Sequence, residues 1–413
     1  MIVRLAWLVT LIGSALCLLL LVAAAQKSLQ TETVLHNFGG FSGDGGFPYG
    51  VLLYNKGTLY GTTYETVPTG PGTVFKIATT GKNYKVLYNF CSLPECGDGG
   101  GPLDLSPTLV LRDGKLYGTA SYGGVGPTAS GTVFNLTLDG TEDTLYSFAN
   151  ESGGAIPEAG VAFDEEGNLY STARSGGEGR CPWYGYYISC GTVFEVTAAG
   201  EYKILHDFGT RLDDGAFPSA GLVRDNDGNF YGTTLQGGGG CPSSFYGCGT
   251  VYEITAAGEE KTIYAFRGRP DDGINPPGAL LLDRQGNLYG TTSAGGAYGG
   301  GTVFKLTPTG EETILYSFGS KPGDATYPSF GSLVSDQKGN LYGTTTNGGT
   351  YGVGTVFEIT TKGKEKILHS FGAQPNDGIA PQAGVVIDTA GNLYGTTPYG
   401  GMYDWGTVFK ITP

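Results

Sequence analysis

Charged residues are scarce in this chain of 413 amino acids. They make up 15% of the sequence, against about 25% in ordinary globular domains. Lysine and arginine together number only 24, against 38 acidic residues, which leaves a net charge of −14. This balance argues against a nucleic acid partner, because nucleic acid binding needs clustered basic side chains over the phosphates. It equally disfavours docking on an anionic lipid surface.

Histidine is rarer still, with three residues in the chain, His36, His206 and His369. All three stand at a position of a repeated motif that tyrosine holds in other copies, as at Tyr264. We therefore expect them to be packing residues of strands. Without a free histidine, a Ser-His-Asp or Cys-His nucleophilic site is difficult to build.

Long apolar runs are absent after the first 25 residues. One such run extends from Leu5 to Val22; Arg4 precedes it, and small residues ending at Ala25 follow it. This pattern predicts a secretory signal over residues 1–25, cleaved to leave a mature chain of residues 26–413. A retained membrane anchor is the alternative, because such a run nearly spans a bilayer. We expect a secreted protein, extracellular or periplasmic, that has no membrane contact after cleavage.

The cysteines agree with export. Six of them follow the predicted cleavage site, as three local pairs. No pair has the two-residue spacing of a zinc knuckle, and no histidine lies nearby, so a metal site is disfavoured. Six cysteines allow 15 connectivities, but proximity favours one. We predict three disulfides, formed in an oxidising compartment, between Cys91 and Cys96, Cys181 and Cys190, and Cys241 and Cys248.

Glycine and aromatic residues, by contrast, are abundant: the chain has 74 glycines, and 12% of its residues are aromatic. A helical bundle is disfavoured, because glycine costs about 1 kcal/mol per helix position relative to alanine. Disordered chains are poor in aromatic residues, and collagen needs a three-residue glycine period that is missing here. The composition therefore predicts many short strands joined by glycine-rich turns.

Three short motifs each recur seven times along the chain, which decides the expected fold. One is Asn-Leu-Tyr-Gly-Thr-Thr, as at Asn287, with variants in other copies. Another is similar to Ile-Leu-Tyr-Ser-Phe and ends at Phe318 in the same copy. The third is Gly-Thr-Val followed by Phe or Tyr, and it begins at Gly72, Gly131, Gly191, Gly249, Gly301, Gly354 and Gly406.

Each repeat contains four strand-like stretches separated by Gly, Asn and Asp turns. Connections this short suit antiparallel strands and leave no room for helical crossovers. We therefore predict an all-β fold, a seven-bladed β-propeller with four antiparallel strands per blade. In the clearest repeat, the strands are expected at residues 332–334, 340–345, 354–360 and 366–371.

The two ends of the repeat array are complementary. The last copy stops at Pro413, just after its third strand, and an orphan fourth strand, Thr33–Phe38, precedes the first copy. The N-terminal strand is therefore predicted to complete the last blade. An open β-solenoid is the alternative, but it would need capping repeats, and the sequence shows none.

The repeat is also similar to that of a known family, and the similarity is clearest at Asn287–Thr292, Gly295-Gly296 and Gly301–Thr307. These residues resemble the tandem repeat of the choice-of-anchor tandem repeat GloVer-containing proteins, and the likeness covers residues 32–413. It implies an exported bacterial protein joined to a C-terminal anchor. This chain departs from that pattern, because it ends at Lys410–Pro413 with no anchor. The resemblance implies no known catalytic residues.

Aspartate recurs in the loops that join one repeat to the next. Aspartate in turns bonds its own backbone, which is the structural interpretation. The alternative is a calcium site, because oxygen ligands on a rigid loop suit a hard cation. Apart from calcium we expect no cofactor. Asp225–Gly228 also looks calcium-like but is expected to be a hairpin turn. The best candidates for calcium ligands are Asp213, Asp214, Asp271 and Asp272.

The connections between second and third strands are long and variable, whereas the other connections within a repeat are short. In a propeller, these variable loops and the interblade loops emerge on one face, and such loops usually carry binding. Exposed aromatic rings suit sugar rings or extended peptides, although the rings could instead pack beneath the loops. We predict an aromatic platform on a disulfide-closed loop, made of Trp183, Tyr184, Tyr186, Tyr187, Phe245, Tyr246 and Trp405.

Together these features predict a non-enzymatic, monomeric binding module for a glycan or a cell-surface or extracellular protein. One alternative is a hydrolase or lyase that acts on polysaccharide with Asp or Glu residues of the loop-rich face. Another is a structural envelope protein. No catalytic residue can be selected, because the acidic loop residues recur around the ring, and the fold alone does not decide between these functions.

Overall fold

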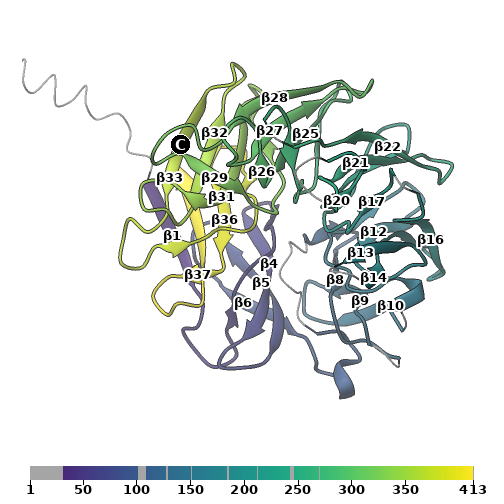
Figure 1. Cartoon of the computed structure of the whole chain (residues 1–413). Coiled ribbons are helices and arrows are strands. Elements are labelled where there is room, and N and C mark those ends of the chain that lie inside the picture. Colours follow the sequence, from purple (N-terminus) through teal and green to yellow (C-terminus); the bar gives the residue numbers. More distant parts are fainter. Residues whose placement is uncertain are drawn as a thin grey trace, which may run out of the picture.

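The computed structural model describes residues 31–100, 108–126, 129–149, 151–183, 186–211, 213–241, 246–268 and 270–412. Seven antiparallel sheets stand around a ring (Figure 1), so the prediction of a seven-bladed β-propeller is confirmed. Short 3-10 turns occur at η1 (Pro94–Cys96) and η2 (Glu151–Gly153). Within the described ranges, no helix is long and apolar enough to cross a membrane. The predicted signal over residues 1–25 lies outside the described residues.

Blade five shows how each repeat folds. Its strands pair in chain order, and the first strands of neighbouring blades approach one another on the inside of the ring. The first turn is held by Asp283, which accepts hydrogen bonds from the backbone N–H and the side-chain amide of Asn287, both at 2.8 Å. The blade consists of β24 (Leu281–Leu282), β25 (Leu288–Thr292), β27 (Thr302–Leu306) and β28 (Glu312–Ser317).

The same Asp–Asn turn recurs in other blades. Asp225 accepts from the backbone N–H of Asn229 at 2.8 Å and from the hydroxyl of Tyr231 at 2.8 Å, so the expected hairpin turn at Asp225 is confirmed. Although burial opposes ionisation, these hydrogen bonds lower the pKa of Asp225. The carboxylate of this turn is thus a structural group.

The other blades follow the same order. Blade one consists of β3 (Leu53–Asn55), β4 (Thr58–Thr66), β5 (Pro71–Ala78) and β6 (Lys85–Asn89). Blade two consists of β7 (Val110–Arg112), β8 (Lys115–Ala120), β9 (Thr132–Thr137) and β10 (Glu142–Ser147). Blade three consists of β11 (Ala162–Phe163), β12 (Leu169–Ala173), β15 (Thr192–Val196) and β16 (Tyr202–Asp207). Blade four consists of β18 (Val223–Arg224), β19 (Phe230–Thr234), β21 (Thr250–Ile254) and β22 (Glu260–Ala265). Blade six consists of β30 (Val334–Ser335), β31 (Leu341–Gly348), β32 (Thr355–Ile359) and β33 (Glu365–Ser370).

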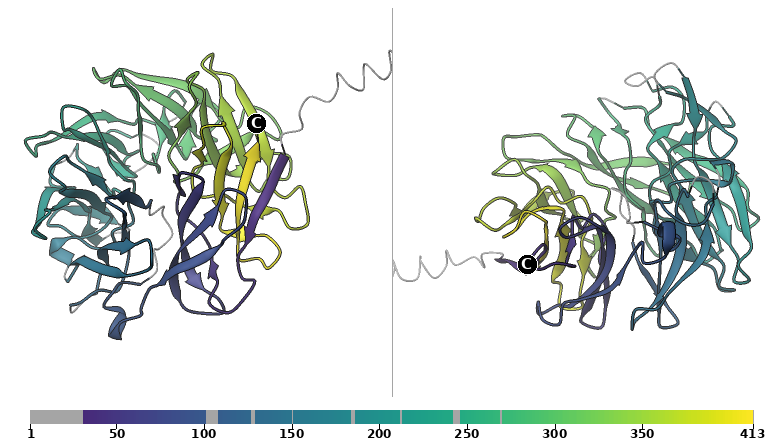
Figure 2. Two further views of the ribbon diagram at one scale, coloured as in Figure 1. Left: turned by 180° about the vertical axis from the view of Figure 1, so that it is seen from behind. Right: turned by 90° about the horizontal axis from the view of Figure 1, so that it is seen from below.

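Blade seven is built from both ends of the chain, as predicted. Its first three strands come from the C-terminal repeat, and its outer strand is the N-terminal β1, which lies beside the last strand in Figure 2. The register is antiparallel, with Glu32 opposite Ile411 and Asn37 opposite Thr407. The strands are β35 (Val386–Ile387), β36 (Leu393–Thr397), β38 (Thr407–Thr412) and β1 (Thr31–Asn37).

The blades are joined by one repeated aromatic contact. The phenylalanine that directly follows each fourth strand packs edge-on against the aromatic ring in the third strand of the next blade, with centroids 5.0–5.3 Å apart. The pair Phe38–Phe75 closes the ring between blades seven and one. Seven clusters of buried side chains surround these contacts. The core of the protein is therefore a set of interfaces between blades.

The glycine of the Tyr-Gly-Thr-Thr motif is required by this packing. A Cβ on Gly290 would lie 2.6 Å from the ring of Phe304, which is closer than real side chains approach. Six of the seven third-strand rings at this place are phenylalanine; the exception is Tyr252. Its hydroxyl is fully buried and has no hydrogen-bond partner in the described part of the chain.

We expect Tyr252→Phe to stabilise the protein, because an unsatisfied buried hydroxyl costs about 1–3 kcal/mol. The melting temperature should rise by roughly 2–4 °C or more. The reverse change in another blade, Phe304→Tyr, is the matched control and should lower the melting temperature. Destabilisation by Tyr252→Phe would show that the hydroxyl has a partner and a structural role.

The interblade loops and the loops between second and third strands meet on one face, as predicted. Short strands from the two kinds of loop pair with each other in several blades. We call this side of the ring the loop face. The strands that join its loops are β2 (Gly45–Gly46) with β4, β17 (Gly215–Ala216) with β20 (Gln236–Gly237), β23 (Gly273–Ile274) with β26 (Ala294–Gly295), β29 (Ala325–Pro328) with β31, and β34 (Gly378–Ile379) with β37 (Tyr399–Gly400).

The pairing with β29 explains a difference from the expected strands of blade six. The second strand, β31, runs to Gly348, whereas the sequence pattern predicts its end at Thr345. The added residues pair with the interblade loop, with Thr326 opposite Asn347. Such a long-range pairing has no signal in the local alternation of side chains.

Candidate functional site

The loop face carries the exposed large apolar side chains of the described residues. These residues all lie in interblade loops or in loops between second and third strands. Exposed apolar surface gathered on one side of a monomer is typical of an interaction site. These residues are Phe41, Leu93, Val125, Tyr186, Tyr187, Tyr298, Tyr327, Tyr351, Tyr399, Met402 and Tyr403.

The predicted aromatic platform is partly described. Tyr186 and Tyr187 lie on β14 (Tyr186–Ser189), which pairs with β13 (Arg180–Trp183), and their side chains are 58% and 71% exposed. Tyr246 is half-buried. Tyr184, Phe245 and the side chain of Trp183 lie outside the described residues, so their part in the platform stays a prediction.

Trp405 sits apart from these residues. It follows β37, which lies across the ring from β13 and β14 (Figure 1). Its indole packs against Phe47, with ring centroids 4.8 Å apart, and a Cβ on Gly39 or Gly46 would lie within 2.5 Å of it. Trp405 is half-buried in the junction that closes the ring, so it does not extend the surface of the β13–β14 hairpin.

All three predicted disulfides form, and two of them flank a cavity on the loop face. The Cys181–Cys190 bond closes the β13–β14 hairpin, and Cys241–Cys248 closes the corresponding loop of blade four. The cavity between these loops has a volume of about 460 Å³, and we call it the hairpin cavity. Its lining includes Arg180, Tyr187, Phe217, Gln236 and Tyr246. Arg180 and Tyr187 also line a second cavity, of about 670 Å³, on the other side of the hairpin.

The polar groups of the hairpin cavity favour a hydroxylated or anionic ligand. Arg180 is exposed, donates to the carbonyls of Gly177 and Gly179, and forms no ion pair within the described ranges. The Oε1 atom of Gln236 is buried and accepts no hydrogen bond from the described residues. A ligand hydroxyl would satisfy this acceptor, because a buried polar atom without a partner is costly.

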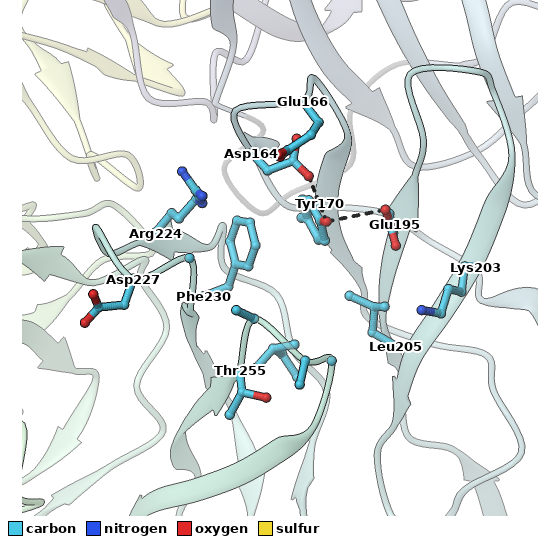
Figure 3. A pocket seen from close by; sticks show the side chains of 15 residues that line it. Asp164, Glu166, Tyr170, Glu195, Lys203, Leu205, Arg224, Asp227, Phe230 and Thr255 are labelled. Atoms are coloured by element: carbon cyan, nitrogen blue, oxygen red, sulfur yellow. Dashed lines mark hydrogen bonds between the residues drawn. The ribbon is translucent and has the colours of Figure 1, made fainter.

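A further cavity, of about 250 Å³, lies on the opposite face between blades three and four (Figure 3). Two of its carboxylates are already used in the fold: the hydroxyl of Tyr170 donates to Asp164 at 3.0 Å and to Glu195 at 3.3 Å. Asp164 also closes its own turn through Asn168. None of the described residues lining this cavity is an exposed large apolar residue. This cavity is a weaker candidate for binding.

The recurrent interblade aspartates are buried and bonded to the backbone. Asp214 accepts hydrogen bonds from the N–H groups of Gly209 at 3.0 Å and Gly215 at 2.9 Å, and Asp44 does the same in its own loop. The turn interpretation is therefore confirmed. Asp213 and Asp271 are exposed, whereas Asp214 and Asp272 are buried, so each candidate calcium pair is divided between surface and interior, and calcium binding stays a prediction.

The histidines do more than pack. Nε2 of His206 lies 3.2 Å from both carboxylate oxygens of Asp214, and His36 and His369 contact Asp44 and Asp377 in the same way. In other blades, tyrosine takes this place: Tyr88 donates to Asp98 at 2.6 Å, for example. The exchange of histidine for tyrosine thus conserves a hydrogen bond to the interblade carboxylate, which the sequence analysis did not foresee.

A second carboxylate completes most of these junctions. It comes from the start of the fourth strand in the following blade, and it was missed because it looks like an ordinary strand residue. Burial, helped by the charge of Asp272, raises the pKa of Glu312 to about 7. Burial and the neighbouring Asp377 likewise raise the pKa of Glu32 to about 7. The Tyr or His, Asp and Glu sets form a repeated polar layer between blades, which we call the junction sites.

Comparisons with solved structures agree with the fold. The chain is 11% identical to an oligogalacturonate lyase in complex with manganese, with a TM-score of 0.55, and the match covers 93% of this chain and 96% of the other. A chain of a nidogen/laminin complex is 14% identical with a TM-score of 0.40, over 73% of this chain and 91% of the other. At 11% identity, the match to the lyase shows the propeller fold alone. No curated protein matches the chain by sequence.

The comparison with protein families confirms the resemblance found in the repeats. The Gloeobacter/Verrucomicrobia repeat matches three overlapping segments, residues 22–184, 108–336 and 241–413, which together cover the whole propeller. The chain belongs to the Gloeobacter/Verrucomicrobia repeat family.

Proposed function

We propose that this propeller is a secreted binding module that holds a glycan on its loop face, with the hairpin cavity as the main contact. The observation that carries the proposal is the confinement of the exposed large apolar side chains to that face within the described residues. The three disulfides indicate an oxidising compartment. They also hold the loops in place before binding, which reduces the ordering cost of recognition.

The chemistry of the hairpin cavity favours a sugar that carries a carboxylate. The exposed ring of Tyr187 offers an apolar face for a pyranose, and Gln236 offers an acceptor for a hydroxyl. The guanidinium of Arg180 matches a carboxylate in a bidentate manner. An extracellular protein is the second kind of partner for the same surface, because exposed tyrosines and arginine are also typical of protein interfaces.

The test is binding to an array of neutral and uronate-containing glycans, followed by affinity measurements on the variants. We expect Tyr187→Ala and Arg180→Ala each to weaken binding about tenfold, as interface hot spots do. The melting temperature should not change with Tyr187→Ala, because this side chain is 71% exposed. Arg284→Ala, at the exposed turn between β24 and β25 on the opposite face, is the control and should leave binding unchanged.

Equal affinities for wild-type protein, Tyr187→Ala and Arg180→Ala would refute the hairpin cavity as the site.

The same experiment addresses the alternative of a hydrolase or lyase. Any glycan that binds is incubated with the protein, and its products are analysed. New reducing ends or unsaturated sugars would show that the protein is a hydrolase or a lyase, whereas an intact glycan supports the binding module. The absence of any glycan or protein partner would favour the structural envelope protein.

A further inference from the structure

The junction sites differ in how they neutralise their acidic side chains. Between blades three and four, His206, Asp214 and Glu260 place a nitrogen and two carboxylate oxygens within 4.8 Å of one another. The guanidinium of Arg211 binds Glu260 there, with Nη2 also 3.9 Å from Asp214. Between blades five and six, Lys321 lies 3.6 Å from Glu365. In both junctions, a cation of the chain itself balances the two acids.

The neutralising residue has a defined place in the loop. Arg211 and Lys321 each stand three residues before the interblade aspartate, and their carbonyls accept a hydrogen bond from its backbone N–H, at 3.3 Å to Asp214 and 3.1 Å to Asp324. The equivalent residue between blades six and seven is Gln374, whose carbonyl accepts from the N–H of Asp377 at 3.1 Å. The turn is the same, but its side chain is uncharged.

Among the described residues, the junction between blades six and seven therefore has the acids without a lysine or arginine paired to them. Glu32, His369 and Asp377 also bring one nitrogen and two carboxylate oxygens within 4.8 Å of one another. The carboxylate of Asp377 is fully buried, and the side chain of His369 is 12% exposed. The Oε1 atom of Glu32 is buried and has no hydrogen-bond partner among the described residues.

We propose that Glu32, His369 and Asp377 bind a divalent transition-metal cation, such as Zn²⁺ or Mn²⁺, in the place that arginine or lysine fills in the sister junctions. The ion would join β1 of blade seven to β33 of blade six, and so would fasten the strand that closes the ring. The donor set decides the class of metal: an imidazole nitrogen with two carboxylates suits zinc and manganese, whereas calcium prefers oxygen ligands.

The test is calorimetric titration of the tag-free, chelator-treated protein with Zn²⁺, Mn²⁺ or Ca²⁺. We expect one zinc ion per chain and a rise in melting temperature that EDTA reverses, because a ligand that binds the folded state stabilises it. Glu32→Gln keeps the shape of the side chain and removes a ligand. It should weaken zinc binding more than about 100-fold, since even residues that only orient metal ligands contribute about 10–100-fold.

Two exchanges of the neutralising residue make the test specific. Gln374→Arg should abolish zinc binding, because a guanidinium would occupy the place of the ion. Arg211→Gln should raise the stoichiometry from one to two, because it frees His206, Asp214 and Glu260. Circular dichroism checks that each variant is folded. A folded wild-type protein that binds no zinc, zinc binding unaffected by Glu32→Gln and Gln374→Arg, or a preference for Ca²⁺ over Zn²⁺ would each overturn the proposal.

Discussion

Removal of Gln26–Phe38 should lower the melting temperature by at least about 10 °C and cause aggregation. The deletion takes away all of β1, which leaves the edge of β38 unpaired, and exposed strand edges invite pairing between molecules. It also removes Phe38, which is fully buried against Phe75. Loss of one such ring costs about 3–5 kcal/mol, and about 1 kcal/mol corresponds to roughly 2–4 °C in domains above 150 residues.

The control for this deletion lacks only Gln26–Gln30, so that β1 remains; both proteins are compared without residues 1–25. Thermal unfolding and light scattering are the measurements. The point variant Phe38→Ala tests the same interface in a chain that keeps its edge strand, and we expect it to lose as much stability as Phe318→Ala in another junction. Equal melting temperatures for the deletion and its control would refute closure by β1.

The protein should be more stable at pH 5 than at pH 8. Burial is the main reason that the pKa values of Glu142, Glu312 and Glu365 rise from 4.5 to about 7. As the pH rises from about 4.5 to 7, the unfolded chain releases these protons before the folded protein does. The free energy of unfolding therefore falls across this window, by on the order of 1 kcal/mol per glutamate after allowance for solvent screening.

At low pH, the stability of the protein is limited by the aspartates of the turns. Although burial opposes it, hydrogen bonds from Asn287 lower the pKa of Asp283, and the equivalent turns behave alike. Stability from these groups is present above the pKa of unfolded aspartate, near 4, and is lost as the pH falls below it. Maximum stability is therefore expected between about pH 4 and 5.

Thermal unfolding in EDTA from pH 4 to 9 checks this profile, and a melting temperature at pH 8 that is roughly 5–10 °C below the value at pH 5 is expected. Glu312→Gln should raise the melting temperature at pH 8 and flatten the profile, because the amide stays neutral. Glu311→Gln, at the exposed neighbouring position, is the control and should change neither. A profile that rises from pH 5 to pH 8 would show that these glutamates are ionised in the folded protein.

The sequence was a good guide to the propeller because the information is repeated and local. Blades three to seven share the turn of Asp283, and all seven blades share the aromatic contact, so that the clearest copies of a motif identify the more divergent ones. The cysteine pairs were equally predictable, because each lies within one loop. Burial of single aromatic residues was harder to predict. Tyr187 and Trp405 both stand in a loop between second and third strands, but Tyr187 is exposed and Trp405 packs against Phe47.

The sequence by itself determined the number of blades, the closure of the ring by the N-terminal strand and the disulfide partners, since periodicity and proximity along the chain carry that information. Only the tertiary structure decided the junction sites. Glu32 and His369 stand near opposite ends of the chain and meet because ring closure brings β1 beside blade six. The residue three positions before the interblade aspartate can be read from the sequence, but its reach to a glutamate of the next blade depends on contacts between blades, which leave no pattern within a single strand.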